Sequence, residues 1–482
     1  MIIINQTAFQ TWIEKEKKAL ELITIVGHLS LERSIELVLF RKPLVDVAGV
    51  EVLAAHQHAQ EISKKDISIY DTLEIAKAIK NSHIAPSRID LGKLAIQWIE
   101  SHHRYASVHD FVTRHLAAHI GKNKRSLEPK DIVLYGFGRI GRLVAREIIS
   151  QTGKGEQLRL KAVVVRSFKT EDLSKRANLF KSDSIHHDFK GTLIIDDRNN
   201  CFIVNGQRIH IINGDQPEEI DYTKYDINNA LLIDSTGILR DRAGLNKHLN
   251  AKGISKVLLT APGKGDLPNI VAGINDKKLD FDKEHIFTCA SCTTNAIVPV
   301  LQLINDAFKI QKGHVETIHA YTNDQNLLDN YHRKERRGRS AALNMVITET
   351  GAANAVAKVI PKLAGKLTGS AVRVPVPNGS LAILNLSTYK TVSLEKVEET
   401  LQNEALFGEL SEQIDYSMSK ELVSSDIIGN SHASIIDGPS TVIGPDNKSL
   451  VLYVWYDNEY GYSKQVVRLA KKIAGVVRLT YY

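Results

Sequence analysis

The sequence predicts a three-part fold, in which an α/β domain with a mostly parallel sheet is preceded by an all-α region and followed by an α+β domain. From Asp131 onward, short β-branched runs end in glycine turns and alternate with helical or hairpin-like segments, as in DIVLYGFG, LKAVVVRS, ALLIDSTG, KVLLTAPG and NIVAGIN. Strands that alternate with helices favour a parallel sheet. After Cys292, one strong helix, TNAIVPVLQLINDAFKI, is followed by longer strand-like stretches such as HVETIHAYT and SLVLYVWYD. This change of pattern indicates a second, mixed domain.

The first 127 residues differ from the rest of the chain. Segments such as SIELVLFRKPLVDVAGVEVLAAHQHAQEIS and TLEIAKAIK place apolar residues at helical spacing and contain few glycines. The polar stretch GKNKRSLEPKD then marks a boundary. We expect a helical extension at 1–127, the α/β domain at 128–291 and the α+β domain at 292–458. The amphipathic run YSKQVVRLAKKIAGVVRL predicts that 459–482 forms a closing helix that packs on the α/β domain.

The composition of the 482-residue chain, with 43% hydrophobic and 24% charged residues, is that of an ordinary globular protein. It excludes a mini-protein, a disulfide scaffold and a largely disordered chain. Three cysteines in a chain of this length suit a reducing compartment, so we expect a cytoplasmic protein. The N-terminus has no signal-peptide pattern, and no run of about 18 apolar residues predicts a membrane span.

The formal net charge of +7 has two interpretations. Basic proteins often bind nucleic acid, but Lys and Arg are spread along this chain without a dense aromatic and basic motif. Attraction to anionic small molecules explains the charge equally well, and we do not expect a nucleic-acid partner.

A glycine motif, GFGRIG at residues 136–141, stands directly after the apolar run DIVLY and opens the helical segment RIGRLVAREIIS. In such a motif Gly136 allows a tight turn, Gly138 lets a pyrophosphate approach the backbone, and Gly141 lets the helix pack closely on the strand. The context between strand and helix favours a Rossmann-type dinucleotide-binding domain. The alternative is a plain glycine-rich turn.

The second strand of this domain, LKAVVVRS, predicts which dinucleotide is bound. An NAD site normally has an acidic residue at this strand end to hold the ribose 2′-hydroxyl, but here the strand ends in Arg166 and Ser167. A guanidinium beside a small hydroxyl suits a 2′-phosphate. We therefore favour NADP, or use of both cofactors, over strict NAD. The alternative is that Arg166 is a solvated surface residue.

A small-residue turn, ASCTTN at residues 290–295, leads from a strand into a helix. A cysteine at a helix N-terminus has its thiolate favoured, and His319, which follows Cys292 by 27 residues, suits the role of its base. The alternatives are an inert buried cysteine and, because Cys289 and Cys292 form a C-x-x-C pair, a redox dithiol or metal site. Neither thioredoxin-like context nor a second pair of metal ligands accompanies the cysteines.

From Asp131 to about Tyr482 the chain resembles phosphorylating glyceraldehyde-3-phosphate dehydrogenases. The motifs GFGRIGR, DSTG, ASCTTN, HAYTNDQ, TGAA, GKLTGSAVRVP and WYDNEYGYS stand in that family's order and at its spacing. The helical N-terminal region lies outside the family pattern.

The resemblance implies oxidation of glyceraldehyde 3-phosphate to 1,3-bisphosphoglycerate, a reaction of glycolysis and gluconeogenesis, with hydride transfer to NADP or NAD. Cys292 would add to the aldehyde as a hemithioacetal, and His319 would act as general base during hydride transfer. Inorganic phosphate would then attack the resulting thioester and release an acyl phosphate.

The same resemblance implies the residues that bind each ligand. Those that would bind the substrate phosphate are Thr322 and Arg373. Those that would bind the attacking phosphate are Ser291, Thr293, Thr350 and Gly351, although such hydroxyls also serve commonly in turns and helix caps. Those that would line the cofactor are Arg139 and Ile140 at the pyrophosphate, Ser235, Thr236 and Gly237 near the adenosine, and Asn458 and Tyr462 near the nicotinamide. No metal ligand is implied.

Three further features concern how this chain compares with the family and how the family's subunits assemble. Asp324 stands where many family members have a threonine, and an insertion lies near QTGKGEQLR. The segment 324–342 corresponds to a loop that packs across a subunit interface in the family, which implies a homotetramer. Its basic cluster would also favour a 2′-phosphate, although a solvated loop is the simpler interpretation.

Two other functions remain open from the sequence alone. Erythrose-4-phosphate dehydrogenase shares the same chemistry, and a non-catalytic regulator on the dehydrogenase fold would use the basic N-terminal region to bind RNA or a protein. The N-terminal region contains about half of the 18 histidines, among them His102, His103, His109, His115 and His119. The spacing of His115 and His119 places them on one helical face and makes a metal site conceivable, but we favour scattered surface histidines.

Overall fold

The computed structural model describes residues 2–120, 127–167, 169–348 and 350–482. These residues form two compact units. The N-terminal unit contains the chain up to residue 129 together with two distant segments, 152–157 and 475–482. The second unit contains residues 130–151 and 158–474.

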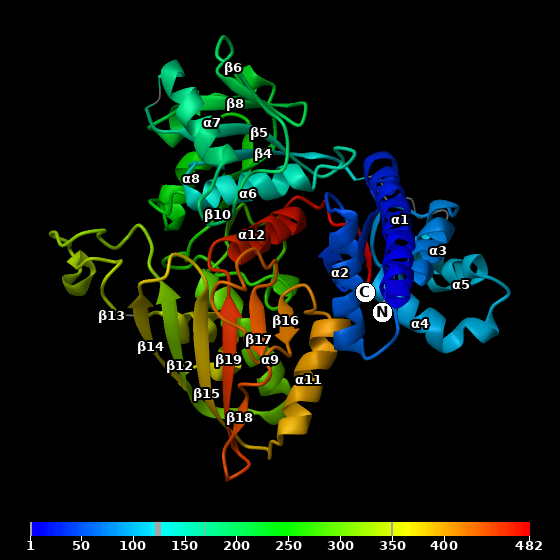
Figure 1. Cartoon of the computed structure of the whole chain (residues 1–482). Coiled ribbons are helices and arrows are strands. Elements are labelled where there is room, and N and C mark those ends of the chain that lie inside the picture. The colour runs from blue at the N-terminus through cyan, green and yellow to red at the C-terminus, as the bar shows by residue number, and fades with distance from the viewer. Residues whose placement is uncertain (1, 121–126, 168, 349) are drawn as a thin grey trace. The chain divides into compact units, whose positions relative to one another are not determined.

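The N-terminal unit combines helices with a four-stranded sheet (Figure 1). Its helices are α1 (Ile2–Arg33), α2 (Gly49–Ser63), α3 (Ile69–Lys80), α4 (Leu91–Ser101) and α5 (Val108–His115). Its strands are β1 (Glu36–Leu39), β2 (Lys42–Pro43), β3 (Ser87–Asp90) and β20 (Leu479–Tyr481), in the order β2-β1-β3-β20. The expected helices are present, but the region is not all-α. Phe40 and Arg41 adopt left-handed backbone conformations that turn the apolar run of β1 into a tight hairpin with β2.

The end of the chain belongs to this small sheet rather than to a longer closing helix. Helix α12 (Tyr460–Ile473) stops because Gly475 adopts a left-handed φ of 70°. Strand β20 then pairs in parallel with β3, and the Tyr481 hydroxyl donates to Gln97 Oε1 at 2.7 Å. The last residues therefore form a half-buried strand rather than a continuation of the helix.

The insertion noted in the sequence supplies another part of the N-terminal unit. Residues 152–157 belong to that unit, and Glu156 accepts a hydrogen bond from Ser34 Oγ at 2.7 Å. The insertion is therefore accounted for by a structural contact that the family pattern alone does not predict.

The α/β domain contains an eight-stranded sheet in the order β11-β10-β9-β4-β5-β8-β7-β6. The parallel strands are β4 (Lys130–Tyr135), β5 (Leu158–Val165), β8 (Gln207–Asn213), β9 (Ala230–Asp234), β10 (Ile254–Leu259) and β11 (Ile286–Thr288). The antiparallel edge is β6 (Leu193–Asp196) and β7 (Cys201–Val204), and the helices are α6 (Arg139–Ser150), α7 (Leu173–Lys181) and α8 (Arg242–Leu249). The predicted parallel sheet is confirmed. One predicted strand is wrong, because NIVAGIN turns at Gly273 and contributes only an isolated bridge at Asn269.

The α+β domain is built on a second eight-stranded sheet in the order β13-β14-β12-β15-β19-β17-β16, with β18 beside β19 (Figure 1). Its strands are β12 (Ile310–Ala320), β13 (Val346–Thr348), β14 (Leu367–Val374), β15 (Ser380–Thr388), β16 (Ile414–Ser417), β17 (Ser434–Asp437), β18 (Val442–Ile443) and β19 (Ser449–Tyr456). Its helices are α9 (Cys292–Phe308), α10 (Ala352–Val359) and α11 (Leu394–Phe407).

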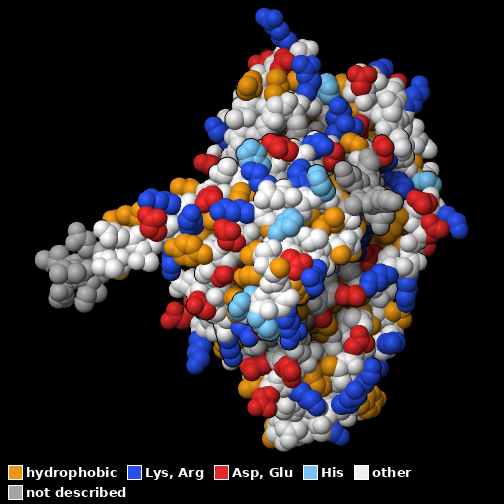
Figure 2. All heavy atoms as spheres, turned by 90° about the vertical axis from the view of Figure 1, so that its right-hand side faces the viewer, with side chains coloured by type: hydrophobic (Ala, Val, Ile, Leu, Met, Phe, Trp, Pro, Cys, Tyr) orange, Lys and Arg blue, Asp and Glu red, His pale blue; other side chains and the backbone are white. Residues whose placement is uncertain are grey.

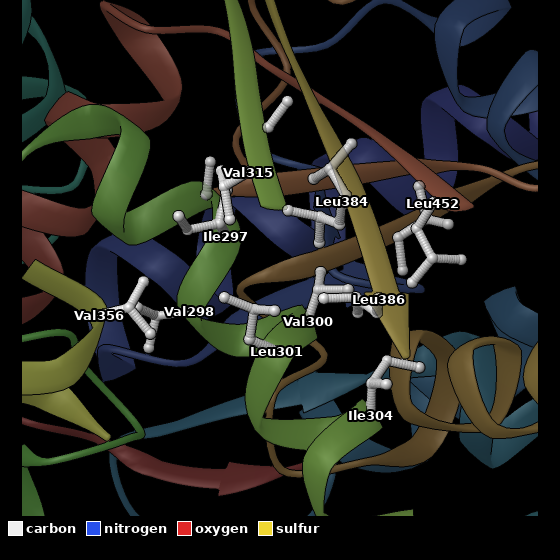
Figure 3. Packing of buried hydrophobic residues seen from close by; sticks show 14 of the residues in the cluster. Ile297, Val298, Val300, Leu301, Ile304, Val315, Val356, Leu384, Leu386 and Leu452 are labelled. Carbon is white, nitrogen blue, oxygen red and sulfur yellow. The ribbon is translucent and has the colours of Figure 1, made fainter. Parts of the chain in front are cut away.

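Helix α9 packs its apolar face against this sheet and so fixes its own N-terminus. Figure 3 shows apolar side chains of α9 facing those of β12, β15 and β19. Leu301, Val315 and Leu384 are fully buried there, and each such side chain contributes roughly 1.5–3 kcal/mol of hydrophobic stabilisation. The position of Cys292, the first residue of α9, is therefore determined by the core beneath it.

The charged surface carries both signs of charge in the view of Figure 2. On that face the described Lys and Arg side chains alternate with Asp and Glu rather than gathering into one basic field. Across the described ranges, no helix combines the length and the apolar character needed to cross a membrane.

Candidate active site

Cys292 follows a strained turn at the end of β11. Ala290 adopts a left-handed φ of 51°, which is uncommon for a residue with a side chain. The Tyr462 hydroxyl donates to the Ala290 carbonyl at 3.0 Å and holds this turn. Ser291 caps α9, since its Oγ accepts a hydrogen bond from the Thr294 N–H at 3.0 Å. The turn therefore presents Cys292 at a helix N-terminus, where the helix dipole favours a thiolate.

His319, near the end of β12, lies against the Cys292 sulfur. Its Nε2 is 3.5 Å from Sγ. Burial and the positive charge of Arg373 lower the pKa of His319 to about 3, so the ring is neutral near pH 7. A neutral imidazole in contact with a thiol has one nitrogen free to accept a proton, which is what a general base requires.

Arg373 completes a three-residue chain of contacts across neighbouring strands. It lies on β14, directly opposite His319 in the parallel register with β12. Its Nη1 is 2.6 Å from His319 Nδ1 and donates to the Ala320 carbonyl at 2.7 Å. His319 Nδ1 also lies 2.7 Å from the Ala320 carbonyl oxygen, which only accepts, so a ring proton on Nδ1 donates there and leaves Nε2 free to accept the Cys292 proton. Burial raises the pKa of the Cys292 thiol, and the charge of Arg373 acts in the opposite direction.

The other predicted phosphate-binding residues lie just after β12 and at the N-termini of α9 and α10. Thr322 is half-buried just after β12. Thr350 and Gly351 precede α10, where Thr350 Oγ1 accepts from the Ala352 N–H at 3.2 Å. A Cβ at Gly351 would meet nothing within 4 Å, so its backbone is open to a ligand. Thr293 Oγ1 lies 3.1 Å from the Tyr456 hydroxyl.

Arg337 is a further cation at this site that the sequence analysis missed. Its guanidinium, in a side chain that is almost fully buried, donates to the Asp324 carboxylate and to Thr348 Oγ1. Its charge also lowers the pKa of His319. The basic cluster of segment 324–342 was interpreted as a solvated loop, but Asp324 in the HAYTNDQ motif needs a compensating charge. An acidic residue inside this motif indicates a basic partner nearby, and this is the sequence feature that points to Arg337.

The glycine motif forms the turn that a dinucleotide requires. Gly136 has a φ of 99°, and a Cβ there would lie 2.9 Å from the Thr236 side chain. A Cβ at Gly141 would lie 2.4 Å from the Gly136 carbonyl oxygen, so close helix packing excludes any side chain. A Cβ at Gly138 would meet nothing within 4 Å, which leaves open space at the N-terminus of α6. The turn fits a pyrophosphate approaching the backbone N–H groups, including that of Ile140.

The DSTG turn lies beside the glycine motif because β9 neighbours β4. Ser235 Oγ donates to the Gly136 carbonyl at 2.8 Å. The buried Asp234 carboxylate accepts from the Thr236 N–H and hydroxyl, both at 2.7 Å, and Gly237 follows with a φ of 62°. The two turns therefore support one another at the switch point of the sheet, where ligands bind in such folds.

The Arg139 side chain is engaged by carboxylates rather than free for a ligand. It donates to Glu459 at 2.5 Å and to Asp183 at 3.1 Å. His186 Nε2 lies 3.1 Å from the other Glu459 oxygen. Any contact of Arg139 with a pyrophosphate would therefore come from its backbone. Glu459 and Asp183 were not predicted, although Glu459 stands inside the WYDNEYGYS motif.

Arg166 and Ser167 lie at the carboxyl end of β5, beside the glycine turn. The Gly136 N–H donates to the Val164 carbonyl at 2.9 Å, which places the end of β5 next to that turn. Both Arg166 and Ser167 are exposed, and Ser167 has a φ of 35°. The structure thus brings Cys292 into contact with His319, while Arg166 and Ser167 remain exposed at the end of β5.

Asn458 and Tyr462 flank the start of α12 and are both buried. Asn458 Oδ1 accepts a hydrogen bond from Ser380 Oγ at 2.7 Å. Tyr462 supports the turn before Cys292, as described above. The two residues predicted near the nicotinamide therefore lie at the start of α12, and one of them, Tyr462, also holds the turn before Cys292.

The N-terminal histidines make ordinary polar contacts. His115 lies between two hydroxyls, with Nε2 3.0 Å from Tyr105 and Nδ1 3.1 Å from Tyr481. His119 Nε2 lies 3.4 Å from the Thr480 carbonyl oxygen. Within the described part of the chain, no three His, Cys, Asp or Glu side chains gather closely enough to hold a metal ion.

Comparison with protein families finds two matching models. Residues 130–242 match the glyceraldehyde 3-phosphate dehydrogenase NAD binding domain, and residues 291–458 match the glyceraldehyde 3-phosphate dehydrogenase C-terminal domain. Together these ranges contain the glycine turn, Cys292, His319 and Arg373.

Similar proteins divide by how much of the chain they share. A glyceraldehyde-3-phosphate dehydrogenase-like protein of Pseudomonas aeruginosa is 48% identical over 94% of this chain and 98% of its own length. Glyceraldehyde-3-phosphate dehydrogenase 2 of Trichormus variabilis is 41% identical over 71% of this chain and 98% of its own. Glyceraldehyde-3-phosphate dehydrogenase 2 of Bacillus subtilis is 38% identical over 71% and 96%. Only the first of these three extends through most of the N-terminal unit.

Proposed function

Because this chain belongs to the glyceraldehyde-3-phosphate dehydrogenase family, we propose that it oxidises D-glyceraldehyde 3-phosphate with inorganic phosphate to 1,3-bisphosphoglycerate. The observation that carries the proposal is the contact of Cys292 Sγ with His319 Nε2 at 3.5 Å, at the N-terminus of α9. An aldehyde donates hydride poorly until a nucleophile adds to it, and a thiolate is suited to that addition.

In the proposed mechanism His319 takes the Cys292 proton, the thiolate adds to the aldehyde carbon, and the proton passes from His319 to the aldehyde oxygen to form a hemithioacetal. His319 then takes the hydroxyl proton as the C–H bond releases hydride, and the carbon becomes a thioester on Cys292. A bound nicotinamide dinucleotide supplies the hydride acceptor. Attack of phosphate on the thioester breaks the C–S bond, forms the acyl phosphate and returns Cys292 as thiolate.

Two sets of donors bind the phosphates in this mechanism. Arg373 and Thr322 hold the substrate phosphate, and Arg337 neutralises Asp324 beside them. With the ring proton on Nδ1 donated to the Ala320 carbonyl oxygen, 2.7 Å away, His319 Nε2 accepts the proton of the hemithioacetal. The attacking phosphate is bound by donors that surround the α9 and α10 N-termini: Ser291, Thr293, Thr350 and Gly351.

For the cofactor we propose NADP in preference to NAD, with Arg166 and Ser167 binding the 2′-phosphate. The exposed guanidinium beside the glycine turn supports this preference, and no carboxylate stands at that strand end to repel a phosphate. Replacement of Arg166 by Ala should lower kcat/KM for NADP and leave that for NAD nearly unchanged. Equal loss with both cofactors would contradict the assignment.

We further propose a cytoplasmic homotetramer. Large apolar side chains are exposed in and just after the segment 324–342, where the family packs subunits together, and they include Leu327, Leu328, Tyr331, Leu343 and Met345. Large apolar side chains exposed close together in one segment are typical of a protein interaction site. The three cysteines are free thiols, which suits the reducing conditions of the cytoplasm.

The test of the proposed function is the initial rate with D-glyceraldehyde 3-phosphate and either cofactor, with and without inorganic phosphate. We expect phosphate-dependent turnover that is lost in Cys292→Ser and strongly reduced in His319→Gln. Cys201→Ser serves as the matched control, because Cys201 is a buried cysteine on β7. Turnover only with erythrose 4-phosphate, or none with either substrate, would overturn the proposal.

A further inference from the structure

Ser380, the first residue of β15, links the base to the residue assigned to the nicotinamide. It is fully buried. Its Oγ accepts a hydrogen bond from the Ala320 N–H at 3.1 Å and donates to Asn458 Oδ1 at 2.7 Å. Ala320 follows His319 directly in the chain. One hydroxyl therefore connects the strand that carries the base to the Asn458 amide.

The backbone and the side chain of Asn458 are fixed by different contacts. The neighbouring Asp457 carboxylate accepts from the Glu459 and Tyr460 N–H groups at 2.9 and 2.8 Å, which fixes the backbone at the start of α12. Asn378 Nδ2 donates to the same carboxylate oxygen at 2.8 Å. None of these contacts restrains rotation of the Asn458 amide about its last bond.

The contact with Ser380 does restrain that rotation. An amide oxygen only accepts, so the hydroxyl must donate to Oδ1, and the Asn458 NH₂ group is directed away from Ser380. Within the described residues this NH₂ group donates to no protein acceptor, which leaves it for a ligand. A rotation by 180° would place a second donor on Ser380 Oγ beside the Ala320 N–H and would turn the amide oxygen towards the ligand instead.

We propose that Ser380 is a positioning residue that holds the Asn458 amide with its NH₂ group towards the nicotinamide carboxamide, and so selects the ring face that receives hydride. The inference rests on the proposed function. A carboxamide oxygen accepts from an NH₂ group, so a fixed Asn458 amide fixes the carboxamide and the ring attached to it. Without the hydroxyl, the amide can present either end, and the ring loses its single orientation.

The test compares a dinucleotide with its ADP-ribose fragment, which lacks the nicotinamide, by isothermal titration calorimetry. The dinucleotide used is whichever of NADP and NAD binds the wild type more tightly. In Ser380→Ala its affinity should fall about five- to tenfold, because one buried hydrogen bond is lost. Binding of the fragment should not change. Ser434→Ala is the matched control, since Ser434 is also fully buried and its Oγ donates to the Ala296 carbonyl at 2.5 Å.

A second measurement follows the stereochemistry of hydride transfer. With substrate deuterated at the aldehyde carbon, nuclear magnetic resonance of the reduced cofactor shows which face received the label. We expect one face in the wild type and in Ser434→Ala, and a mixture in Ser380→Ala. A general loss of stability would lower the rate without mixing the faces.

A variant of similar side-chain size tests whether the loss of binding comes from the missing hydroxyl rather than from misfolding. Ser380→Cys replaces the hydroxyl by a weaker donor and should give an intermediate loss of dinucleotide binding. Asn458→Ala should reproduce the nicotinamide-specific loss, and the double variant should be no worse than Asn458→Ala alone. Additive losses in the double variant would overturn the inference.

The outcomes separate the inference from the proposed function. If the wild type binds the dinucleotide and Ser380→Ala leaves both affinity and face selection unchanged, the inference alone is wrong. Equal weakening of the dinucleotide and its fragment would also overturn it, because that result indicates a general distortion. Failure of the wild type to bind any nicotinamide dinucleotide would overturn the proposed function and the inference together.

Discussion

Removal of the Arg373 charge should raise the pH at which Cys292 becomes reactive. Burial raises the pKa of the Cys292 thiol, and the Arg373 charge lowers it. The guanidinium reaches His319 Nδ1 at 2.6 Å, and the far side of the ring reaches the sulfur at 3.5 Å. A charge no more than about 8 Å from the sulfur contributes roughly 2 kcal/mol at an effective dielectric constant of about 20. This energy corresponds to a shift of about 1.5 pH units.

The assay is alkylation by iodoacetamide as a function of pH, followed by mass spectrometry of the peptide that contains Cys292. Cys292 is half-buried whereas Cys201 and Cys289 are buried, so the reagent distinguishes it from them. In Arg373→Gln the midpoint of the rate profile should rise by about 1.5 pH units, and the rate near neutral pH should fall by more than tenfold. The plateau at high pH should be unchanged.

Lys312→Gln is the matched control for this prediction. Lys312 is exposed on the same strand as His319, seven residues before it. It should leave the profile of the wild type unaltered. A profile in Arg373→Gln that coincides with that of the wild type would refute the electrostatic role assigned to Arg373.

Three further predictions concern stability. Burial would raise the pKa of Asp183, but backbone N–H groups and the Arg139 guanidinium lower it to about 2. Ionised Asp183 therefore contributes about 2 kcal/mol to the free energy of unfolding above pH 4, and this contribution is lost as the pH falls towards 2. In Asp183→Asn, the free energy of unfolding measured in urea should depend less on pH over that range. Leu301 lies on the buried face of α9, so Leu301→Ala should lower the free energy of unfolding by about 2–5 kcal/mol. The control Leu394→Ala, at an exposed site, should change it by less than about 0.5 kcal/mol. Deletion of residues 479–482 removes β20, so hydrogen exchange should accelerate in β3 and remain unchanged in α9. Equal protection of β3 with and without the deletion would contradict the role of the C-terminal strand.

The two sheets of the second unit could be predicted from short β-branched runs that end in glycine turns in the first and from longer strand-like stretches in the second. The N-terminal unit could not, for physical reasons visible in two places. The run ELVL fits a helical period as well as a strand, and only the left-handed pair Phe40 and Arg41 forces the hairpin. Strand β20 pairs with β3 across almost the whole chain, and no local pattern encodes such a distant partner.

The same contrast applies to the candidate site. Cys292, His319 and Arg373 could be proposed because each lies in a motif whose order and spacing match the family. Ser380 and Arg337 were missed, because their roles depend on which strands and loops meet. Ser380 Oγ reaches Asn458 only through the register of β15 with its neighbours, and Arg337 reaches Asp324 only through the fold of the intervening loop.

The central claim is that Cys292 carries the substrate as a thioester until phosphate removes it. The most direct measurement mixes the enzyme with glyceraldehyde 3-phosphate and cofactor in the absence of inorganic phosphate, then weighs the intact protein and the Cys292 peptide. The proposed mechanism predicts an added 3-phosphoglyceroyl group on Cys292 that disappears when phosphate is supplied, as 1,3-bisphosphoglycerate is released. Phosphate-dependent turnover by a Cys292→Ala variant, or an acyl group found on another residue, would contradict it.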